Sequence, residues 1–237
     1  MAYRGVEDGM KKLLCGCMFI AAAFGAFAGD VAAFVDIGIS SDGKTYIFGE
    51  YGRTDGDFRG YAEIYTVDIG KNDFVPGGIF RTNPSPSTAT KSGKAVYDEL
   101  LAKAGWAIRK YECKPVKAEN LLYLRDDNTS DGTEIVFKDF EGSSSEQTVF
   151  YHARLRTTLD GTRSSFSIDL EKQNEAGTVI SRNVVGNPAI KRKDVTAYRI
   201  DRIFSDSTGR NLIFVIEKTV VDAKGTSIRY MVETIRL

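Results

Sequence analysis

The chain has 237 residues, with 32 lysines and arginines, 32 aspartates and glutamates, and one histidine. A chain of this length buries roughly 70% of its unfolded surface, so it needs no metal ion or disulfide to fold. The balanced charge predicts no binding to nucleic acid or to an anionic membrane surface. One histidine is too few for the clustered ligands of most zinc and transition-metal sites, so neither a cofactor nor a metal is expected.

The segment that begins at Met10 has the pattern of a secretory signal peptide. Two lysines precede an apolar stretch from Leu13 to Phe27, and Ala26-Phe27-Ala28 fits the small-x-small cleavage rule. The apolar stretch is short for a membrane span, so we expect cleavage after Ala28. Glu7 and Asp8 suit a signal poorly, which makes Met10 the expected start. The protein is therefore predicted to be periplasmic or secreted.

A lipoprotein is the alternative, because Leu14-Cys15-Gly16-Cys17 loosely resembles a lipobox. Acylation at Cys17 would leave the longer apolar run after the cleavage site, which disfavours this alternative. Removal of residues 1–28 takes three basic and two acidic residues, so 29 basic face 30 acidic ones in the mature chain. That chain has no further apolar run long enough to span a membrane.

Cys113 is the one cysteine of the mature chain, so no intrachain disulfide is possible there. We expect it to be a half-buried thiol near the end of a helix. An intermolecular bridge or a reactive thiol is the alternative.

Residues 29–237 are expected to form one β-rich domain. Antiparallel hairpins and meanders would build a sandwich or curled sheet with one inserted helix, and a small or incomplete β-propeller is the alternative. Runs of β-branched and aromatic residues predict the first strands at 34–39, 45–51 and 61–69. Asp42-Gly43 predicts a tight turn, because glycine adopts positive φ without steric cost. Pro76 restricts the next strand to a sheet edge.

The centre of the chain contains the one convincing helix. A connector at 81–90 rich in proline, serine and threonine is followed by apolar residues at helical spacing, which predict a helix over about 93–112 with Ser92 as N-cap. Between 134 and 185 the residues alternate, which predicts antiparallel strands with one solvated face. Residues 196–237 predict a three-stranded meander whose middle strand, Leu212 to Ile216, is apolar on both faces and therefore central.

Two stretches of the chain suggest an internal repeat. The sequence DIGISSDGKTYIFGEY aligns with DRIFSDSTGRNLIFVIE when one residue is inserted in the turn. Asp36 then falls on Asp201, and Gly43-Lys44 falls on Gly209-Arg210. A structural duplication explains the alignment, and so does the local similarity that any two strand-turn-strand units share.

Sequence motifs for catalysis and metal binding are weak. His152 lies on the polar face of a predicted strand, and no Gly-x-Ser-x-Gly elbow accompanies it. Residues 126–134 imitate a calcium loop, but Lys138 takes the twelfth position, where a carboxylate is required, so only a looser calcium site stays possible. Paired carboxylates for hydrolysis would be matched in space and give no sequence signal.

A surface patch is the one binding site that the sequence suggests. Aromatic residues and arginines interleave in the segment EYGRTDGDFRGYAEIY, a composition typical of binding hot spots. The residues of this candidate patch are Tyr51, Arg53, Phe58, Arg59 and Tyr61. Coverage of the sheet end by the same aromatics is the structural alternative.

The N-terminal third resembles a family of bacterial predicted secreted proteins with a domain of unknown function. The resemblance rests on FVDIGIS, SDGK, FGEYG, YAEIYTVD and NDFVPG, and extends more weakly to the final meander. It implies export and no assigned activity. The SDGK hairpin also resembles blades of TolB-like and WD-type propellers, but two such units cannot close a ring.

These observations favour an exported, non-catalytic protein that binds a partner or acts as a structural accessory of the periplasm or cell envelope. A carrier of small apolar ligands is one alternative, in which the strands of residues 134–185 would curl into a half-barrel with an apolar lumen. A hydrolase that uses carboxylates alone is the other alternative.

Overall fold

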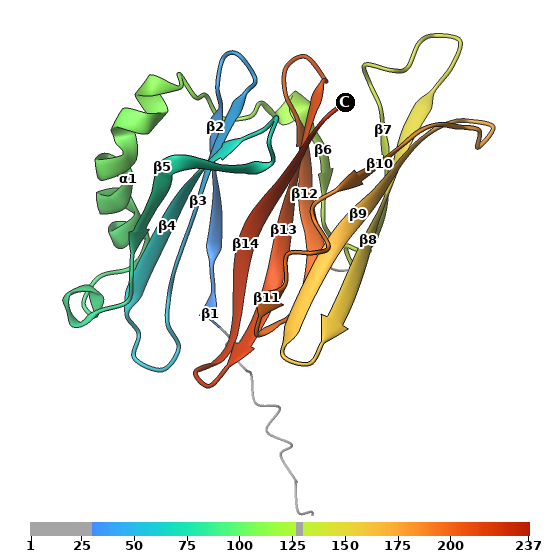
Figure 1. Ribbon diagram of the computed structural model, residues 1–237. Helices are drawn as coiled ribbons and strands as arrows, with labels where there is room; N and C mark the ends of the chain where they lie inside the picture. The colour runs from blue at the N-terminus through green and yellow to red at the C-terminus, as the bar shows by residue number, and fades with distance from the viewer. Residues whose placement is uncertain (1–29, 127–129) are drawn as a thin grey trace, which may run out of the picture.

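The computed structural model describes residues 30–126 and 130–237. The predicted signal segment and Asp127 of the possible calcium loop lie outside the described residues. Four layers follow one another across the molecule, one helix and three sheets (Figure 1). Mainly β structure with one α-helix, as predicted, is confirmed. The strands stack in layers and do not radiate as blades, so the propeller alternative is wrong.

The first two layers come from the N-terminal half of the described chain. The helix-side sheet has the order β2(Ala33–Ile39), β3(Thr45–Arg53), β4(Gly60–Asp68) and β5(Asp73–Thr82). Helix α1(Gly93–Lys110) follows a 3-10 turn, η1(Pro86–Thr88), and packs on β3, β4 and β5. Strand β5 lies at the edge of the sheet, as Pro76 predicted.

The other two layers are the central sheet and the outer sheet. The central sheet has the order β1(Asp30–Val31), β14(Gly225–Arg236), β13(Asn211–Asp222), β12(Val195–Ser205) and β6(Leu121–Leu124), the last preceded by η2(Ala118–Asn120). The outer sheet has the order β10(Val179–Val185), β9(Arg163–Asn174), β8(Val149–Asp160) and β7(Glu134–Lys138), and β11(Arg192–Lys193) pairs with β9.

Helix α1 forms for the local reasons that the sequence shows. The Ser92 hydroxyl accepts a hydrogen bond from the Ala95 amide at 3.1 Å, which caps the first turn. Val96, Leu100 and Ala104 are buried on one face against the helix-side sheet. The predicted helix is confirmed, and it ends at Lys110, two residues earlier than expected.

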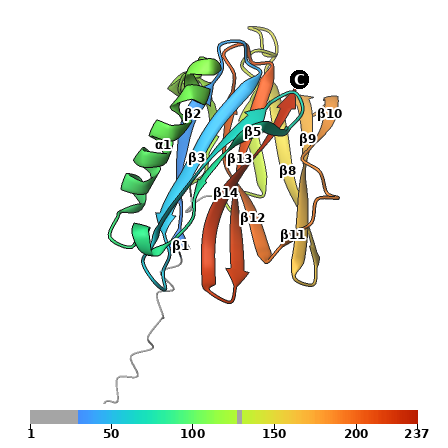
Figure 2. The same cartoon turned by 60° about the vertical axis from the view of Figure 1, so that its left-hand side comes forward.

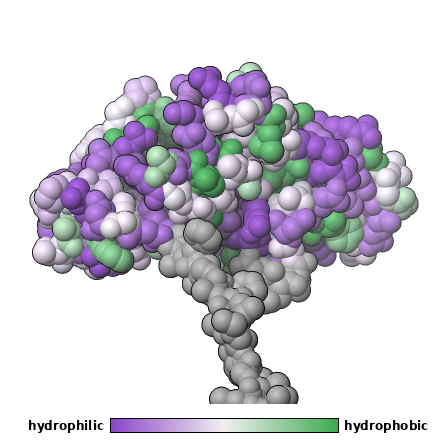
Figure 3. Space-filling model, turned by 90° about the horizontal axis from the view of Figure 1, so that it is seen from below, coloured by the Kyte–Doolittle hydropathy of each residue, from purple (hydrophilic) through white to green (hydrophobic). Residues whose placement is uncertain are grey.

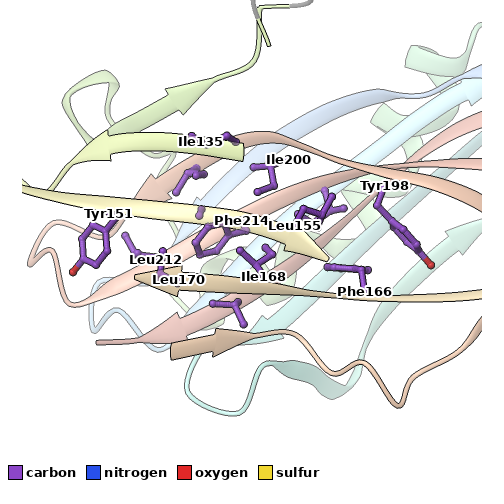
Figure 4. Close-up of a cluster of buried hydrophobic side chains, with 14 of the residues drawn as sticks. Ile135, Tyr151, Leu155, Phe166, Ile168, Leu170, Tyr198, Ile200, Leu212 and Phe214 are labelled. Atoms are coloured by element: carbon purple, nitrogen blue, oxygen red, sulfur yellow. The ribbon is translucent and has the colours of Figure 1, made fainter. Parts of the chain in front are cut away.

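The central sheet is buried on both faces, which explains the continuous apolar run of β13. Leu212 and Phe214 pack toward the outer sheet (Figure 4), and Ile216 belongs to the same cluster. Ile213 and Val215 pack toward the helix-side sheet. The predicted central position of this strand is confirmed.

The half-barrel with an apolar lumen, which the carrier alternative placed within residues 134–185, is not formed, so this form of the alternative was wrong. The apolar faces of β8 and β9, including Leu155, Phe166 and Ile168, pack directly on the central sheet (Figure 4). Alternation along a strand shows which side chains are buried, but it does not show whether another sheet covers them.

The two aligned hairpin turns have the same construction. In each turn the side-chain oxygen at the first position accepts hydrogen bonds from the backbone amides four and five residues later. Ser40 accepts from Lys44 and Thr45 at 3.1 and 2.9 Å. Asp206 accepts from Arg210 and Asn211 at 2.9 and 3.1 Å. Gly43 and Gly209 occupy the same position with φ of +68° and +63°.

These turns have equal lengths, so the insertion that we expected in the turn was placed wrongly. The register irregularities of the two hairpins lie inside the strands, between Asp36 and Gly38 in β2 and between Ile200 and Arg202 in β12. Consequently Ser40 corresponds to Asp206, and Asp36 does not correspond to Asp201. A bulge absorbs an extra residue without changing the turn, which sequence alignment alone cannot detect.

Candidate functional site

The β3–β4 loop, residues 54–59, contains the exposed part of the predicted surface patch. It lies at the end of the helix-side sheet where the described chain begins (Figure 1). Arg53 ends β3 just before the loop, and Phe58 and Arg59 belong to it. The loop therefore brings three of the five predicted site residues together.

A set of short-range hydrogen bonds holds this loop in one shape. The Thr54 amide donates to the Arg59 carbonyl at 3.0 Å, and the Arg59 amide donates back to the Thr54 hydroxyl at 2.9 Å. The same hydroxyl donates to the Asp57 carboxylate, which holds the pKa of Asp57 below its usual value. Arg59 forms an ion pair with Asp57 at 3.0 Å, so its charge is balanced within the loop.

Phe58 projects from the loop in an unusual backbone conformation. Its φ is +50°, a region that costs an L-residue on the order of 1–2 kcal/mol, and its side chain is 61% exposed. Arg53 fixes it, because Nε donates to the Phe58 carbonyl at 2.7 Å and the guanidinium lies 5.8 Å from the ring centroid. Arg53 also donates to the Ala89 carbonyl at 3.2 Å, which ties the loop to the connector before α1.

The other two predicted residues lie elsewhere. Tyr51 is half-buried on the helix side of its sheet, with its ring 5.2 Å from that of Tyr97. Tyr61 is 4% exposed and donates to Asp30 Oδ1 at 2.7 Å, while the Arg229 guanidinium lies 4.3 Å from its ring. Burial raises the pKa of Tyr61 well above its usual value. Both tyrosines thus act in packing, one on each face of the sheet.

At the end of the molecule that carries the β3–β4 loop, the visible surface of the described residues is of mixed polarity (Figure 3). Figure 3 views the molecule from this end, where hydrophobic residues form small separate areas among hydrophilic ones. A partner that binds here would therefore contact single projecting side chains, of which Phe58 is a strongly exposed example.

His152 and a buried cluster of charged residues are two further groups whose side chains are of types used in catalysis. His152 lies on the outer face of β8, in register with Val136 and Glu171. Glu217 and Asp201 converge on the buried guanidinium of Arg125 at 2.5 and 3.8 Å, between sheets and away from solvent. The carboxylates of Asp201 and Glu217 are therefore neutralised by Arg125 and shielded from solvent.

Cys113 is half-buried, as expected. Burial raises the pKa of its thiol to about 11, so the thiol stays protonated at neutral pH. Because the thiolate is the nucleophilic form, this environment disfavours the reactive-thiol alternative.

Sequence reasoning missed the residues that shape the loop, namely Thr54, Asp57 and Ala89. The first two had a readable signal, because Thr and Asp near Gly commonly cap tight turns through their side chains. Ala89 contributes only its carbonyl oxygen, for which the sequence carries no signal.

Comparison with known proteins identifies one family. The family model described as "Predicted secreted protein (DUF2259)" matches residues 47–236, four-fifths of the chain. A search of curated proteins found no match.

Proposed function

The chain belongs to the predicted secreted protein family DUF2259, and from this premise we propose that it is an exported, non-catalytic binding protein or structural accessory of the periplasm or cell envelope. The feature that supports binding most directly is Phe58, an exposed aromatic residue held in a strained conformation. Strain of this kind persists where the surrounding structure enforces it, and it concentrates at functional sites.

Export is supported by the family, which is described as one of predicted secreted proteins. We infer cleavage after Ala28, and the first strand, β1, begins two residues later at Asp30. Asp30 is held by hydrogen bonds to Tyr61 and Arg229, so a chain cleaved after Ala28 would keep β1 in place. Within residues 30–126 and 130–237 no helix is long and apolar enough to cross a membrane.

The β3–β4 loop suits a protein partner of the envelope. A preformed loop loses little conformational entropy on binding, so the contact energy of one aromatic anchor is retained. Phe58 would enter an apolar pocket of the partner. The Arg53 guanidinium stacks beside it and would remain at the rim.

Cross-linking in cells tests this proposal. A photoreactive residue at position 58 should capture a specific envelope protein, whereas the same residue at Leu159, which is 64% exposed near the end of β8, should not. With the photoreactive residue placed instead at Asp55, an exposed residue of the same loop, Phe58→Gly should abolish capture. The variant should leave the free energy of unfolding equal or higher, because glycine relieves the positive φ.

Two results would contradict the proposal. One is capture that is equal from positions 58 and 159. The other is a Phe58→Gly variant that retains its partner. N-terminal sequencing of the exported protein checks the cleavage site independently, with Gly29 as the expected first residue.

A further inference from the structure

A groove of about 910 Å³ lies at the opposite end of the molecule from the β3–β4 loop. Its walls are the β2–β3 turn, the β4–β5 hairpin, the β12–β13 turn and a strap at 114–117 that follows α1. Figures 1 and 2 both place the β2–β3 and β12–β13 turns at this end. Segments far apart in the sequence thus form one concave surface.

The groove is built on the repeated turns, which touch each other. The side-chain Nδ2 of Asn211 donates a hydrogen bond to the Gly43 carbonyl at 3.1 Å. A Cβ added at Gly43 would lie 3.0 Å from Asp206 Oδ2, so the close approach suits glycine. The two hairpins of similar construction therefore meet turn to turn, one from the helix-side sheet and one from the central sheet.

The strap is held rigidly against β2. The backbone of Lys114 exchanges hydrogen bonds with that of Ile39 at 2.9 and 3.0 Å, and the Val116 amide donates to Asp36 at 2.8 Å. A Cβ at Gly38 would lie 2.1 Å from the Lys114 carbonyl, so only glycine admits the strap there. The position of Lys114 at the groove is consequently fixed by backbone contacts.

The carboxylates in the groove are engaged within their own turns. Asp206 accepts from Thr208, Arg210 and Asn211, and Asp42 accepts from Ser40 and the Lys44 amide. Asp68 accepts from the Lys71 amide and lies 3.4 Å from the Lys71 ammonium. Asp73 accepts from the Phe74 amide.

Three cations of the groove have no such partner. Lys114, Arg210 and Arg236 line it, and none of them forms an ion pair with another described residue. The second turn differs from the first at the decisive position, where Thr208 replaces Asp42. The Arg210 guanidinium consequently forms no ion pair like the one that joins Lys44 to Asp42 at 3.4 Å.

One side of the groove is apolar. Phe74 is 44% exposed there, and its ring lies 5.3 Å from Tyr65 at the end of an aromatic stack between the sheets. Val75, Pro76 and Val116 continue this surface. An aromatic residue left exposed beside unpaired cations is an arrangement that suits a ligand with two chemically different parts.

We propose that this groove binds a small amphiphilic anion, with a phosphate or carboxylate group on Lys114, Arg210 and Arg236 and an apolar chain on Phe74, Val75 and Pro76. Guanidinium groups match both oxyanions in geometry, so the head-group class includes both. The site is separate from the β3–β4 loop and goes beyond the proposed partner binding. It also gives the carrier alternative a different binding site, because the apolar face of the outer sheet is packed on the central sheet and leaves no room for a ligand.

Calorimetric titration of the full mature chain with four probes tests both halves of the proposal. Octyl phosphate and octanoate should bind, and increasing salt should weaken them because the contact is ionic. Octanol, which lacks the charge, and inorganic phosphate, which lacks the chain, should each bind at least about tenfold more weakly.

Charge reversal locates the site. The double variant Arg210→Glu/Arg236→Glu should weaken octyl phosphate at least about tenfold. Lys224→Glu, at the β13–β14 turn on the opposite end, is the matched control and should leave binding unchanged. Thermal unfolding of each variant shows whether the fold is retained, and Arg210→Gln/Arg236→Gln replaces the double variant if it is not.

Every other outcome overturns the proposal in part or whole. If octanol binds as tightly as octyl phosphate, the cations do not contribute to binding. If inorganic phosphate binds as tightly, the apolar side formed by Phe74, Val75 and Pro76 does not contribute. If Arg210→Glu/Arg236→Glu leaves the affinity for octyl phosphate unchanged, the ligand does not bind in this groove. Binding to vesicles of anionic phospholipid without binding of octyl phosphate would assign the cations to a membrane surface and contradict a groove for single molecules.

Discussion

The two faces of the central sheet differ sharply in chemistry. The face toward the outer sheet is an apolar core built from Leu212, Phe214 and Ile216 with the inner residues of β8 and β9. At the interface with the helix-side sheet, stacked aromatics mix with buried charges, among them Glu217 from the central sheet and Glu50 from the helix-side sheet. The first interface stabilises through apolar burial, whereas the second also satisfies polar groups that the sheet leaves unpaired.

The polar interface closes the edge of β14 beyond the short β1. Glu50 accepts a hydrogen bond from the Tyr230 amide at 2.7 Å, and Asn72 accepts one from the Thr234 amide at 2.7 Å. Side chains of the helix-side sheet thus occupy edge amides that would otherwise be open to another strand. The comparison predicts large, pH-independent effects on the apolar face and smaller, pH-dependent ones on the polar face.

The largest effect is expected in the apolar core. Phe214→Ala removes a side chain with no exposed surface and should lower the free energy of unfolding by about 3–5 kcal/mol. Val184→Ala, at a side chain that is 62% exposed on β10, is the control and should change it little. Urea unfolding measures both. A loss below about 1 kcal/mol at Phe214 would show that the core can collapse around the cavity.

The polar face should give a pH-dependent effect through Glu50. Burial raises its pKa from 4.5 to about 7, while Lys218 and Arg229 favour the charged form and Glu63 opposes it. The folded state therefore holds the proton more tightly than the unfolded state does. This contribution to stability is complete below about pH 4.5 and is lost as the pH rises through about 7.

Glu50→Gln isolates this contribution, because glutamine keeps an acceptor for the Tyr230 amide. Between these pH values, the free energy of unfolding of the parent should fall relative to that of the variant by up to about 3 kcal/mol. Chemical unfolding at a series of pH values measures the difference. If the free energy of unfolding depends on pH in the same way in both proteins, the pKa of Glu50 is not raised in the folded state.

The contact between the repeated turns should give an intermediate effect. Gly43→Ala meets both a φ of +68° and Asp206 at 3.0 Å, so we expect a loss of about 2 kcal/mol. Gly161→Ala has a similar φ of +59°, but no described atom lies within 4 Å, so about 1 kcal/mol is expected. Thermal unfolding compares the two, and equal losses would mean that the turns do not press on each other.

The smallest effect is expected on the solvated face of the outer sheet. Arg156 and Asp169 form an ion pair at 2.9 Å with side chains 55% and 44% exposed. Arg156→Ala should therefore cost less than about 1 kcal/mol. A larger loss in calorimetry would indicate that this face is covered in solution.

The candidate site was only partly predictable. The interleaved aromatics and arginines pointed to the correct loop, but the strand period could not show that Tyr61 is covered by Arg229 and Asp30 from the central sheet. The groove was missed, although both repeated turns end in a basic residue, Lys44 and Arg210. The β12–β13 turn reaches the groove only because two sheets pack together, and the strap at 114–117 reaches it only through its hydrogen bonds to β2.

The sequence by itself determined the local elements: the turn at Gly43, the N-cap at Ser92, the edge position of β5 and the central position of β13. Each follows from short-range physics, namely allowed φ, unpaired amides, a missing N–H in proline and an apolar period. The order of the layers, the filled outer sheet and the meeting of the two turns were decided only in the tertiary structure. Alternation specifies that a face is buried, but the choice of the covering face depends on contacts between residues that are distant in the sequence.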